Sequence, residues 1–221
     1  MNTIQTFLDS LEQKNPFVMN SKQYSNYKKT ITLPQSKPRL LLHSCCGPCS
    51  TSVIERLVDF FDITVIYYNP NIYPDEEYIK RQNEQEKFLT QHFAKIPLIK
   101  CDWDAEVFEN AVKTLQSEPE GGKRCQVCFA LRLNKTAQIA ASGGFDIFAT
   151  TLSVSPHKNS QLINELGQSI AKQTGTRYLV ADFKKQNGYL NSIKLSKEYD
   201  LYRQDYCGCK YSMQQKNNLK N

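Results

Sequence analysis

The stretch Arg39-Leu-Leu-Leu-His-Ser-Cys-Cys-Gly-Pro-Cys-Ser50 decides how the first half of the chain folds. Its first five residues form a short, mostly apolar run that suits a buried β-strand. Pro48 then starts a helix, because proline is favoured in the first helical turn, and apolar residues continue at helical spacing to Phe61. Three cysteines stand in this strand-to-helix turn: Cys45, Cys46 and Cys49.

Strands and helices keep alternating along the chain. Runs rich in apolar, β-branched and aromatic residues predict strands at 39–43, 62–68, 96–100 and 145–149, and a short fifth strand at 177–180. Helical patterns fill the intervals, at 48–61, 74–92, 104–115, 125–142, 158–174 and 188–202. Such alternation predicts an α/β fold with a mostly parallel sheet and helices on both faces.

The two ends of the chain differ from this pattern. The first 38 residues hold one amphipathic helix and a polar segment, and the residues after Ser212 are polar. We therefore expect an N-terminal helical and polar extension (1–38), an α/β catalytic domain (39–212) and a loose tail (213–221). We see no internal repeat.

Polar residues follow two of the predicted strands. The first cysteines follow strand 39–43, and the segment Ser153–His157 follows strand 145–149. Ligands bind beyond the carboxyl ends of strands in parallel sheets, so both segments should lie on one rim.

Composition sets the class of protein. The chain has 221 residues, a net charge of +6 and 40% hydrophobic residues, which is ordinary for a globular protein. No apolar run approaches the roughly 18 residues of a membrane span. The N-terminus lacks the pattern of a secretory signal, so we expect a cytoplasmic protein. The charge permits an anionic partner such as RNA without requiring one.

Eight cysteines are many for a cytoplasmic chain, where disulfides are disfavoured and clustered thiols bind metal or carry redox chemistry. Seven of them fall into three groups, which are Cys45, Cys46 and Cys49; Cys125 and Cys128; and Cys207 and Cys209. Only Cys101 stands apart, as a plain strand-end residue.

Two interpretations compete for the first group. Cys46-Gly-Pro-Cys49 between a strand and a helix has the form of a thioredoxin dithiol. That interpretation leaves the other grouped cysteines without a role, and Cys45 stands where thioredoxins usually have tryptophan. A metal site uses them, because Cys125-x-x-Cys128 presents two thiolates to one site. Seven grouped sulfurs exceed the needs of one zinc ion, so we favour an iron–sulfur cluster, with zinc as the alternative metal.

The third group has another character. A disulfide across the single residue Gly208 would close a tight ring, and strained disulfides are the labile, catalytic kind. Cys207 and Cys209 therefore either store two electrons or hold a second metal. His43, close to the first group, is either a donor to sulfur or a core histidine. His157, at a helix start on the rim, is a candidate proton donor or phosphate contact, with loop packing as the alternative.

Six segments together carry a resemblance to a known family. They are LLHSCCGPCS (41–50), YNPN (68–71), RCQVCFALR (124–132), TLSVSPHK (151–158), DFKK (182–185) and YRQDYCGC (202–209). In this order they resemble the epoxyqueuosine reductase QueH family over about residues 39 to 212.

The resemblance implies a Rossmannoid, nucleotide α-hydrolase-like fold and the last step of queuosine synthesis. In that step epoxyqueuosine in the anticodon of tRNA is reduced to queuosine and the epoxide oxygen leaves as water. It also implies a [4Fe-4S] cluster, with a second, mononuclear iron beside it. Carried over by motif, the cluster cysteines are Cys45, Cys46, Cys125 and Cys128.

The resemblance makes Cys207 and Cys209 the redox-active pair. Cys49 is less settled, because some relatives have an aspartate at this place; it is a candidate ligand of the second iron. His157 and Asp205 are candidate proton donors. The electron donor is not identified by the sequence. The rival hypotheses are a thiol–disulfide oxidoreductase that uses Cys46 and Cys49, and a zinc-stabilised RNA-binding domain.

Side chains near the rim are candidates for contact with the tRNA. Basic residues would meet its backbone, and tyrosines would stack on unpaired bases, with packing in the protein as the alternative. The basic candidates are Arg124, Arg132, Lys158 and Lys184, and the tyrosines are Tyr67, Tyr68 and Tyr73.

Overall fold

The computed structural model describes residues 3–218, which fold into a mixed α/β structure. Its elements in chain order are α1 (Ile4–Gln13), η1 (Pro16–Val18), α2 (Ser21–Thr30), β1 (Arg39–Ser44), α3 (Gly47–Leu57), β2 (Asp62–Tyr67), α4 (Asp75–His92), β3 (Leu98–Lys100), α5 (Ala105–Ala111), α6 (Lys123–Ser142), β4 (Ile147–Thr150), η2 (Thr151–Val154), α7 (Ser160–Thr174), α8 (Gly188–Glu198) and α9 (Lys210–Asn218). The predicted alternation of strands and helices is confirmed.

The four strands form one parallel sheet in the order β3-β2-β1-β4. From β1 the chain moves outward through β2 to β3, and it then returns to place β4 on the other side of β1. The connections therefore leave β1 and β4 in opposite directions. In parallel sheets this switch opens a crevice beyond the carboxyl ends of the two strands, where ligands bind.

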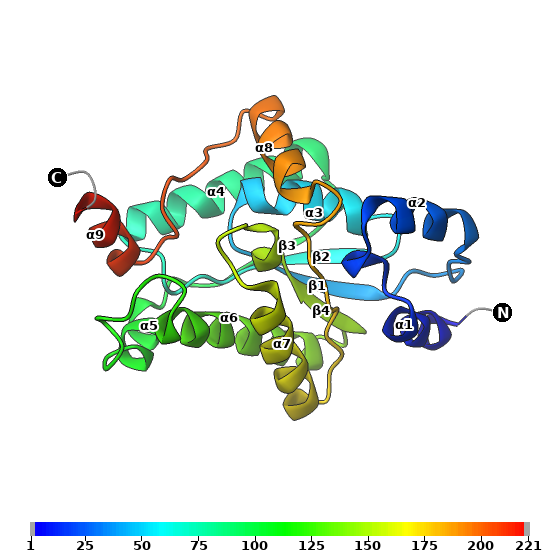
Figure 1. Cartoon of the computed structure of the whole chain (residues 1–221), viewed down its shortest axis with the longest axis horizontal. Coiled ribbons are helices and arrows are strands. Elements are labelled where there is room, and N and C mark those ends of the chain that lie inside the picture. Colours follow the sequence, from blue (N-terminus) through cyan, green and yellow to red (C-terminus); the bar gives the residue numbers. More distant parts are fainter. Residues whose placement is uncertain (1–2, 219–221) are drawn as a thin grey trace.

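Helices cover both faces of the sheet. In Figure 1, α3, α4 and α8 lie on one side of the strands, and α5, α6 and α7 lie on the other. Successive residues of β1 point to opposite faces. Leu40 and Leu42 pack into the cluster built with α3 and α4, whereas Leu41 packs into the cluster built with α6 and α7. Because both faces are buried, β1 is apolar at successive positions, as the sequence analysis expects of a buried parallel strand.

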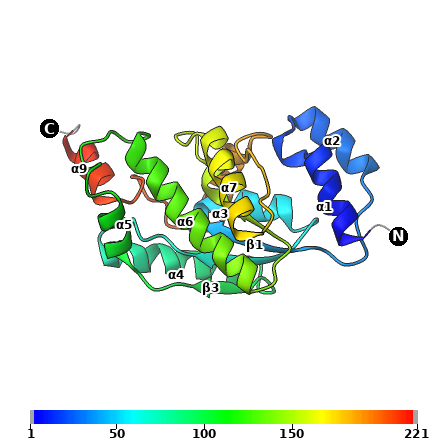
Figure 2. The same cartoon turned by 90° about the horizontal axis from the view of Figure 1, so that it is seen from below.

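The N-terminal segment packs onto the α3 side of the core. Phe7 of α1 and Phe17 of η1 are fully buried, and both rings contact the ring of Phe61. Asn15 caps η1 and donates a side-chain hydrogen bond of 2.7 Å to the carbonyl oxygen of Val180. Figure 2 shows α1 and α2 at one end of the molecule and α9 at the other.

The structure differs from the sequence prediction in three places. Residues 177–180 add only a single parallel bridge, between Tyr178 and Phe148 of β4. The polar segment after α1 contains α2, which begins with a capping box formed by Asn20 and Gln23. The predicted loose tail contains most of α9. Tyr211 of this helix packs against Phe108 of α5, and its neighbour Lys210 forms an ion pair with Glu109 at 2.6 Å. The division into domains stays a prediction.

Candidate active site

The cysteines that follow β1 lie in the crevice between β1 and β4. Cys45 directly follows β1, Cys46 is the residue before α3, and Cys49 lies in the first turn of that helix. Thr151, directly after β4, bridges the two loops, because its hydroxyl accepts from the Cys45 amide at 3.2 Å and donates to the Cys45 sulfur at 3.4 Å. The predicted meeting of the two segments on one rim is confirmed.

The three sulfurs of this loop form a compact set. The Sγ atoms of Cys45, Cys46 and Cys49 all lie within 4.8 Å of one another, and Cys45 and Cys46 are 3.9 Å apart. Metal–sulfur bonds of about 2.3 Å place two thiolates on one tetrahedral ion about 3.8 Å apart. Thiolates are soft ligands that select iron–sulfur clusters, zinc or copper over magnesium and calcium. The set therefore fits a thiolate-bound metal.

Hydrogen bonds between the same sulfurs shift their pKa values in opposite directions. Hydrogen bonds from the thiols of Cys46 and Cys49 hold the pKa of Cys45 well below its usual range. The hydrogen bond to Cys45 in turn raises the pKa of Cys46 to about 12, and that of Cys49 is raised for the same reason. Within this set, the hydrogen bonds between the sulfurs therefore favour Cys45 as the most acidic thiol.

A second group of sulfurs comes from α6. Cys125 and Cys128 lie in its first two turns, where the Gly121 amide donates to Cys125 Sγ at 3.2 Å. The Arg132 guanidinium donates to Cys128 Sγ at 3.1 Å. Burial raises the pKa of Cys128 to about 12, and the positive charge of Arg132 opposes that shift. Cys209 is also buried and accepts from the Ser212 amide at 3.4 Å.

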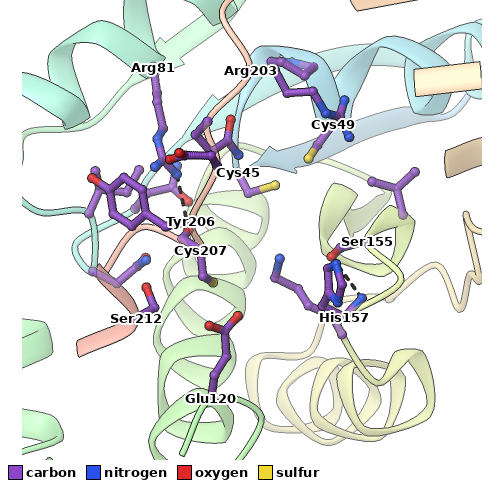
Figure 3. Close-up of a pocket in the computed structure, with 18 of the residues that line it drawn as sticks. Cys45, Cys49, Arg81, Glu120, Ser155, His157, Arg203, Tyr206, Cys207 and Ser212 are labelled. Atoms are coloured by element: carbon purple, nitrogen blue, oxygen red, sulfur yellow. Dashed lines mark hydrogen bonds between the residues drawn. The ribbon is translucent and has the colours of Figure 1, made fainter. Parts of the chain in front are cut away.

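Two adjoining cavities join the cysteine groups. The larger, of about 780 Å³, is lined by Cys45, Cys49 and Cys207, whose sulfurs lie around the same space in Figure 3. The smaller is lined by Cys125, Cys128, Cys207 and Cys209. Residues from several elements line both, so the cavities share a wall: Asn71, Glu120, Arg132, His157, Lys158 and Cys207. The tertiary structure thus gathers cysteines that are far apart in the sequence.

Two positive side chains face these sulfurs. Burial alone lowers the pKa of Lys158, but the neighbouring sulfurs of Cys207, Cys45 and Cys49 outweigh it and raise the pKa above its usual value. The Arg132 guanidinium is 3% exposed and is turned toward Cys128. Arg124 is 1% exposed, so neither arginine is placed on the surface to contact an RNA backbone, and that expectation is wrong for both.

The histidines separate into a structural and a cavity residue. His43 is fully buried; its Nδ1 lies 2.9 Å from the Thr150 hydroxyl, and its Nε2 lies 3.1 Å from the Tyr68 carbonyl. Burial and the nearby Arg132 lower the pKa of His43 to about 4, so the ring stays neutral near pH 7. Of the two alternatives for His43, a donor to sulfur or a core histidine, the contacts support the core histidine. His157 is exposed and lines both cavities (Figure 3).

The larger cavity differs from the sequence prediction in its aromatic residues. Tyr67 and Tyr68 are buried in the core, so the expectation that they stack on RNA bases is wrong. Tyr189 and Arg203 line the cavity instead, with the guanidinium 5.5 Å from the ring centroid. Asp205 lines it too. The Tyr189–Arg203 pair unites residues from two segments that share no motif.

The remaining thiols limit the alternatives. A thioredoxin-type nucleophile must be accessible, yet Cys46 is fully buried and accepts a hydrogen bond of 3.2 Å from Gln204. Cys101 is half-buried directly after β3, as expected of a strand-end residue.

Within residues 3–218, every helix is too short or too polar to cross a bilayer.

The sequence of this chain is similar to one family of known proteins. The family model described as epoxyqueuosine reductase QueH matches residues 40–215. The chain is 44% identical over 205 residues to the epoxyqueuosine reductase QueH of Streptococcus pyogenes serotype M1, covering 88% of this chain and 80% of the relative. It is 35% identical over 177 residues to that of Thermotoga maritima, covering 79% of this chain and 90% of the relative. The chain belongs to the epoxyqueuosine reductase QueH family.

Proposed function

We propose that this protein reduces epoxyqueuosine in tRNA to queuosine. The observation that carries the proposal is the gathering of three cysteine groups around two adjoining cavities, the larger of about 780 Å³. Pockets of about 300–1,000 Å³ hold small molecules, which suits a modified nucleoside extruded from the anticodon loop. Membership of the epoxyqueuosine reductase QueH family supports the same reaction.

The reaction needs two electrons and two protons. Both carbon–oxygen bonds of the epoxide break, a carbon–carbon double bond forms, and the oxygen leaves as water. In the proposal, the thiols of Cys207 and Cys209 supply both electrons as they close to a disulfide, and the two protons they release replace those that His157 and Asp205 give to the leaving oxygen. An external electron donor, which the sequence and structure do not identify, then returns the disulfide to two thiols.

The proposed metal centre uses the remaining grouped cysteines. A [4Fe-4S] cluster held by Cys45, Cys46, Cys125 and Cys128, with a second, mononuclear iron at Cys49, would pass electrons one at a time. The compact set that includes Cys49 supports a role for this residue beside Cys45 and Cys46.

Protons and charge are handled by the cavity wall. His157 and Asp205 line the larger cavity and are the proposed proton donors to the leaving oxygen. Lys158 lines both cavities, where its positive charge favours negative charge that develops on the oxygen.

The rim of the cavity suits an unpaired RNA base. Tyr189 and Arg203 present an aromatic ring and a guanidinium plane side by side, and unpaired bases stack on both kinds of surface. We assign this pair to a nucleotide next to the modified one.

The direct test is nucleoside analysis of tRNA carrying epoxyqueuosine after anaerobic incubation with reconstituted protein and dithionite. We expect epoxyqueuosine to fall and queuosine to rise by an equal amount. Absence of queuosine with protein that contains iron and sulfide would overturn the proposal. Insulin-disulfide reduction in its place would indicate a thiol–disulfide oxidoreductase. Stoichiometric zinc without sulfide would indicate a zinc-stabilised RNA-binding domain.

A further inference from the structure

Glu77 and Arg81, which stand one helical turn apart on α4, form a buried ion pair. The Nε of Arg81 lies 2.6 Å from a carboxylate oxygen of Glu77, and the two side chains are 2% and 11% exposed. Withdrawing two charges from water costs several kcal/mol per ion before their attraction and other hydrogen bonds compensate. The further contacts of this pair therefore indicate what it stabilises.

Both members reach the segment that carries the last two cysteines. Arg81 donates through Nη1 to the Cys207 carbonyl at 3.3 Å, and its guanidinium lies 5.0 Å from the ring centroid of Tyr206. Both carboxylate oxygens of Glu77 accept from the Tyr202 hydroxyl at 3.2 Å. The pair thus holds the segment 202–207 at its two ends.

This segment keeps its shape through side-chain contacts: besides those of the ion pair, the Tyr202 amide donates to Glu84 at 2.8 Å and Gln204 donates to the Cys46 sulfur at 3.2 Å. Residues 201–206 form neither helix nor strand, so no regular ladder of backbone hydrogen bonds orders them. The Tyr73–Pro74 loop adds two contacts: Tyr73 donates its amide to the Gly208 carbonyl at 2.8 Å and accepts at its own carbonyl from the Tyr206 hydroxyl at 2.6 Å.

Gly208 shows how closely the segment follows Arg81. Its φ is +132°, in the region that favours glycine. A Cβ at this position would lie 3.1 Å from Nη1 of Arg81 and 3.4 Å from the side-chain nitrogen of Asn71. The residue between the two thiols therefore lies directly against the arginine, and the half-buried Cys207 lines both cavities.

We propose that the Glu77–Arg81 ion pair is a positioning device that fixes the Cys207–Cys209 segment against α4 and holds the Cys207 thiol at the cavity. Its effect on turnover rests on the proposed function, whereas its effect on the placement of the thiol does not. Arg81 also lines the larger cavity, and in this proposal it acts together with Glu77 through the segment.

The test compares Arg81→Gln and the milder Tyr202→Phe with wild type, all loaded with iron and sulfide. Arg177→Gln is the matched control, because it makes the same change in ion pairs with Asp9 and Glu12 that are far more exposed. Iodoacetamide labelling followed by mass spectrometry gives the alkylation rate of each cysteine. Losing one charge-assisted hydrogen bond should speed alkylation of Cys207 about tenfold in Arg81→Gln, and less in Tyr202→Phe.

A purely structural role predicts a different pattern. Global destabilisation would speed alkylation of the half-buried Cys101, which has no proposed metal role, as much as that of Cys207, and that result overturns the proposal. An unchanged Cys207 rate in folded Arg81→Gln does so as well. If Arg81→Gln does not fold, Tyr202→Phe and Glu77→Gln decide by the same criterion.

Turnover gives the second readout. In the variants, kcat for queuosine formation should fall about tenfold, and KM for tRNA should rise by a smaller factor, because the loosened segment carries both the Cys207 thiol and Arg203. A change confined to KM overturns the proposal. If wild type forms no queuosine, the proposed function fails, and the alkylation rates still decide the positioning role.

Discussion

At the scale of single residues, burial separates thiols that look alike in the sequence. Cys46 is fully buried and its sulfur accepts a hydrogen bond from Gln204, whereas the pKa of the neighbouring Cys45 is lowered. Adjacent residues at the end of a strand point in different directions, so each sulfur meets its own surroundings. The accessible dithiol suggested by the letters CGPC therefore does not form.

The cysteine roles can be separated by substitution. Cys125→Ser should prevent assembly of the cluster, because it removes a proposed ligand. Cys207→Ser should leave iron and sulfide content unchanged yet lower kcat by at least about a hundredfold, as expected when a reacting group is removed. Cys101→Ser is the control that changes neither. Iron and sulfide analysis with a queuosine assay checks all three, and loss of iron in Cys207→Ser would reassign the ligands.

The two histidines should respond in opposite ways. His43→Ala leaves the Thr150 hydroxyl and the Tyr68 carbonyl unpaired in the core, so it should lower the free energy of unfolding by about 3 kcal/mol. His157→Ala removes an exposed side chain and should change it by less than about 0.5 kcal/mol while kcat falls about a hundredfold. Urea unfolding and steady-state kinetics measure the two effects. Equal destabilisation by both changes would contradict the assignment.

At the scale of elements, the strong local patterns predicted the helices well, and the weak ones did not. Helix α7 ends at Gly175 with φ +68°, as its glycine stop signal predicts. Helices α2 and α9 are polar along most of their length, so neither shows the apolar stripe that marks an amphipathic helix in the sequence. Contacts with α5, which is distant in the sequence, hold α9 in place. Such contacts cannot be predicted from a local sequence pattern.

One such contact joins α7 to the bridge beside β4. A Cβ on Gly167 would lie about 2.5–2.6 Å from ring atoms of Tyr178. Gly167→Ala should therefore lower the free energy of unfolding by about 2 kcal/mol through overpacking. In a Tyr178→Ala background the same change should cost close to nothing, because the ring is gone. A double-mutant cycle by urea unfolding measures the coupling, and strict additivity would show that the contact is not the cause.

The rim of the cavity gives a second prediction at this scale. Tyr189→Ala on α8 should raise KM for tRNA by about tenfold to a hundredfold, because stacking on an aromatic ring contributes about 1–3 kcal/mol per base. Tyr189→Phe keeps the ring and should stay near wild type. Steady-state kinetics over a range of tRNA concentrations decides between them. An equal defect in both variants would mean that the hydroxyl matters and the ring does not.

At the scale of the whole molecule, the site is made by three segments that meet only in the folded chain. The loop after β1, the start of α6 and the segment before α9 each supply thiols to the two cavities. A bound metal centre that draws on more than one of them would connect the two faces of the sheet. Such a metal centre would therefore contribute to the stability of the fold.

Removal of metal tests this connection. The loaded protein should unfold about 10 °C above chelator-treated protein, since a ligand that binds only the folded state stabilises it. Hydrogen exchange should also slow at residues 123–128 on loading. Cys125→Ser is the control, in which chelator should leave the melting temperature unchanged. The same melting temperature for loaded and metal-free wild type would exclude a connecting role.

The sequence by itself determined the class of fold and the choice of chemistry. The alternation of strands and helices follows from local hydrophobic patterns, and the three cysteine groups indicate metal and redox chemistry in any arrangement. Only the tertiary structure decided which thiols share a cavity, that Arg132 is turned toward a buried sulfur, and that Arg81 supports the Cys207 segment. These contacts join residues from separate elements, so they depend on sheet order and burial, which no local stretch of sequence contains.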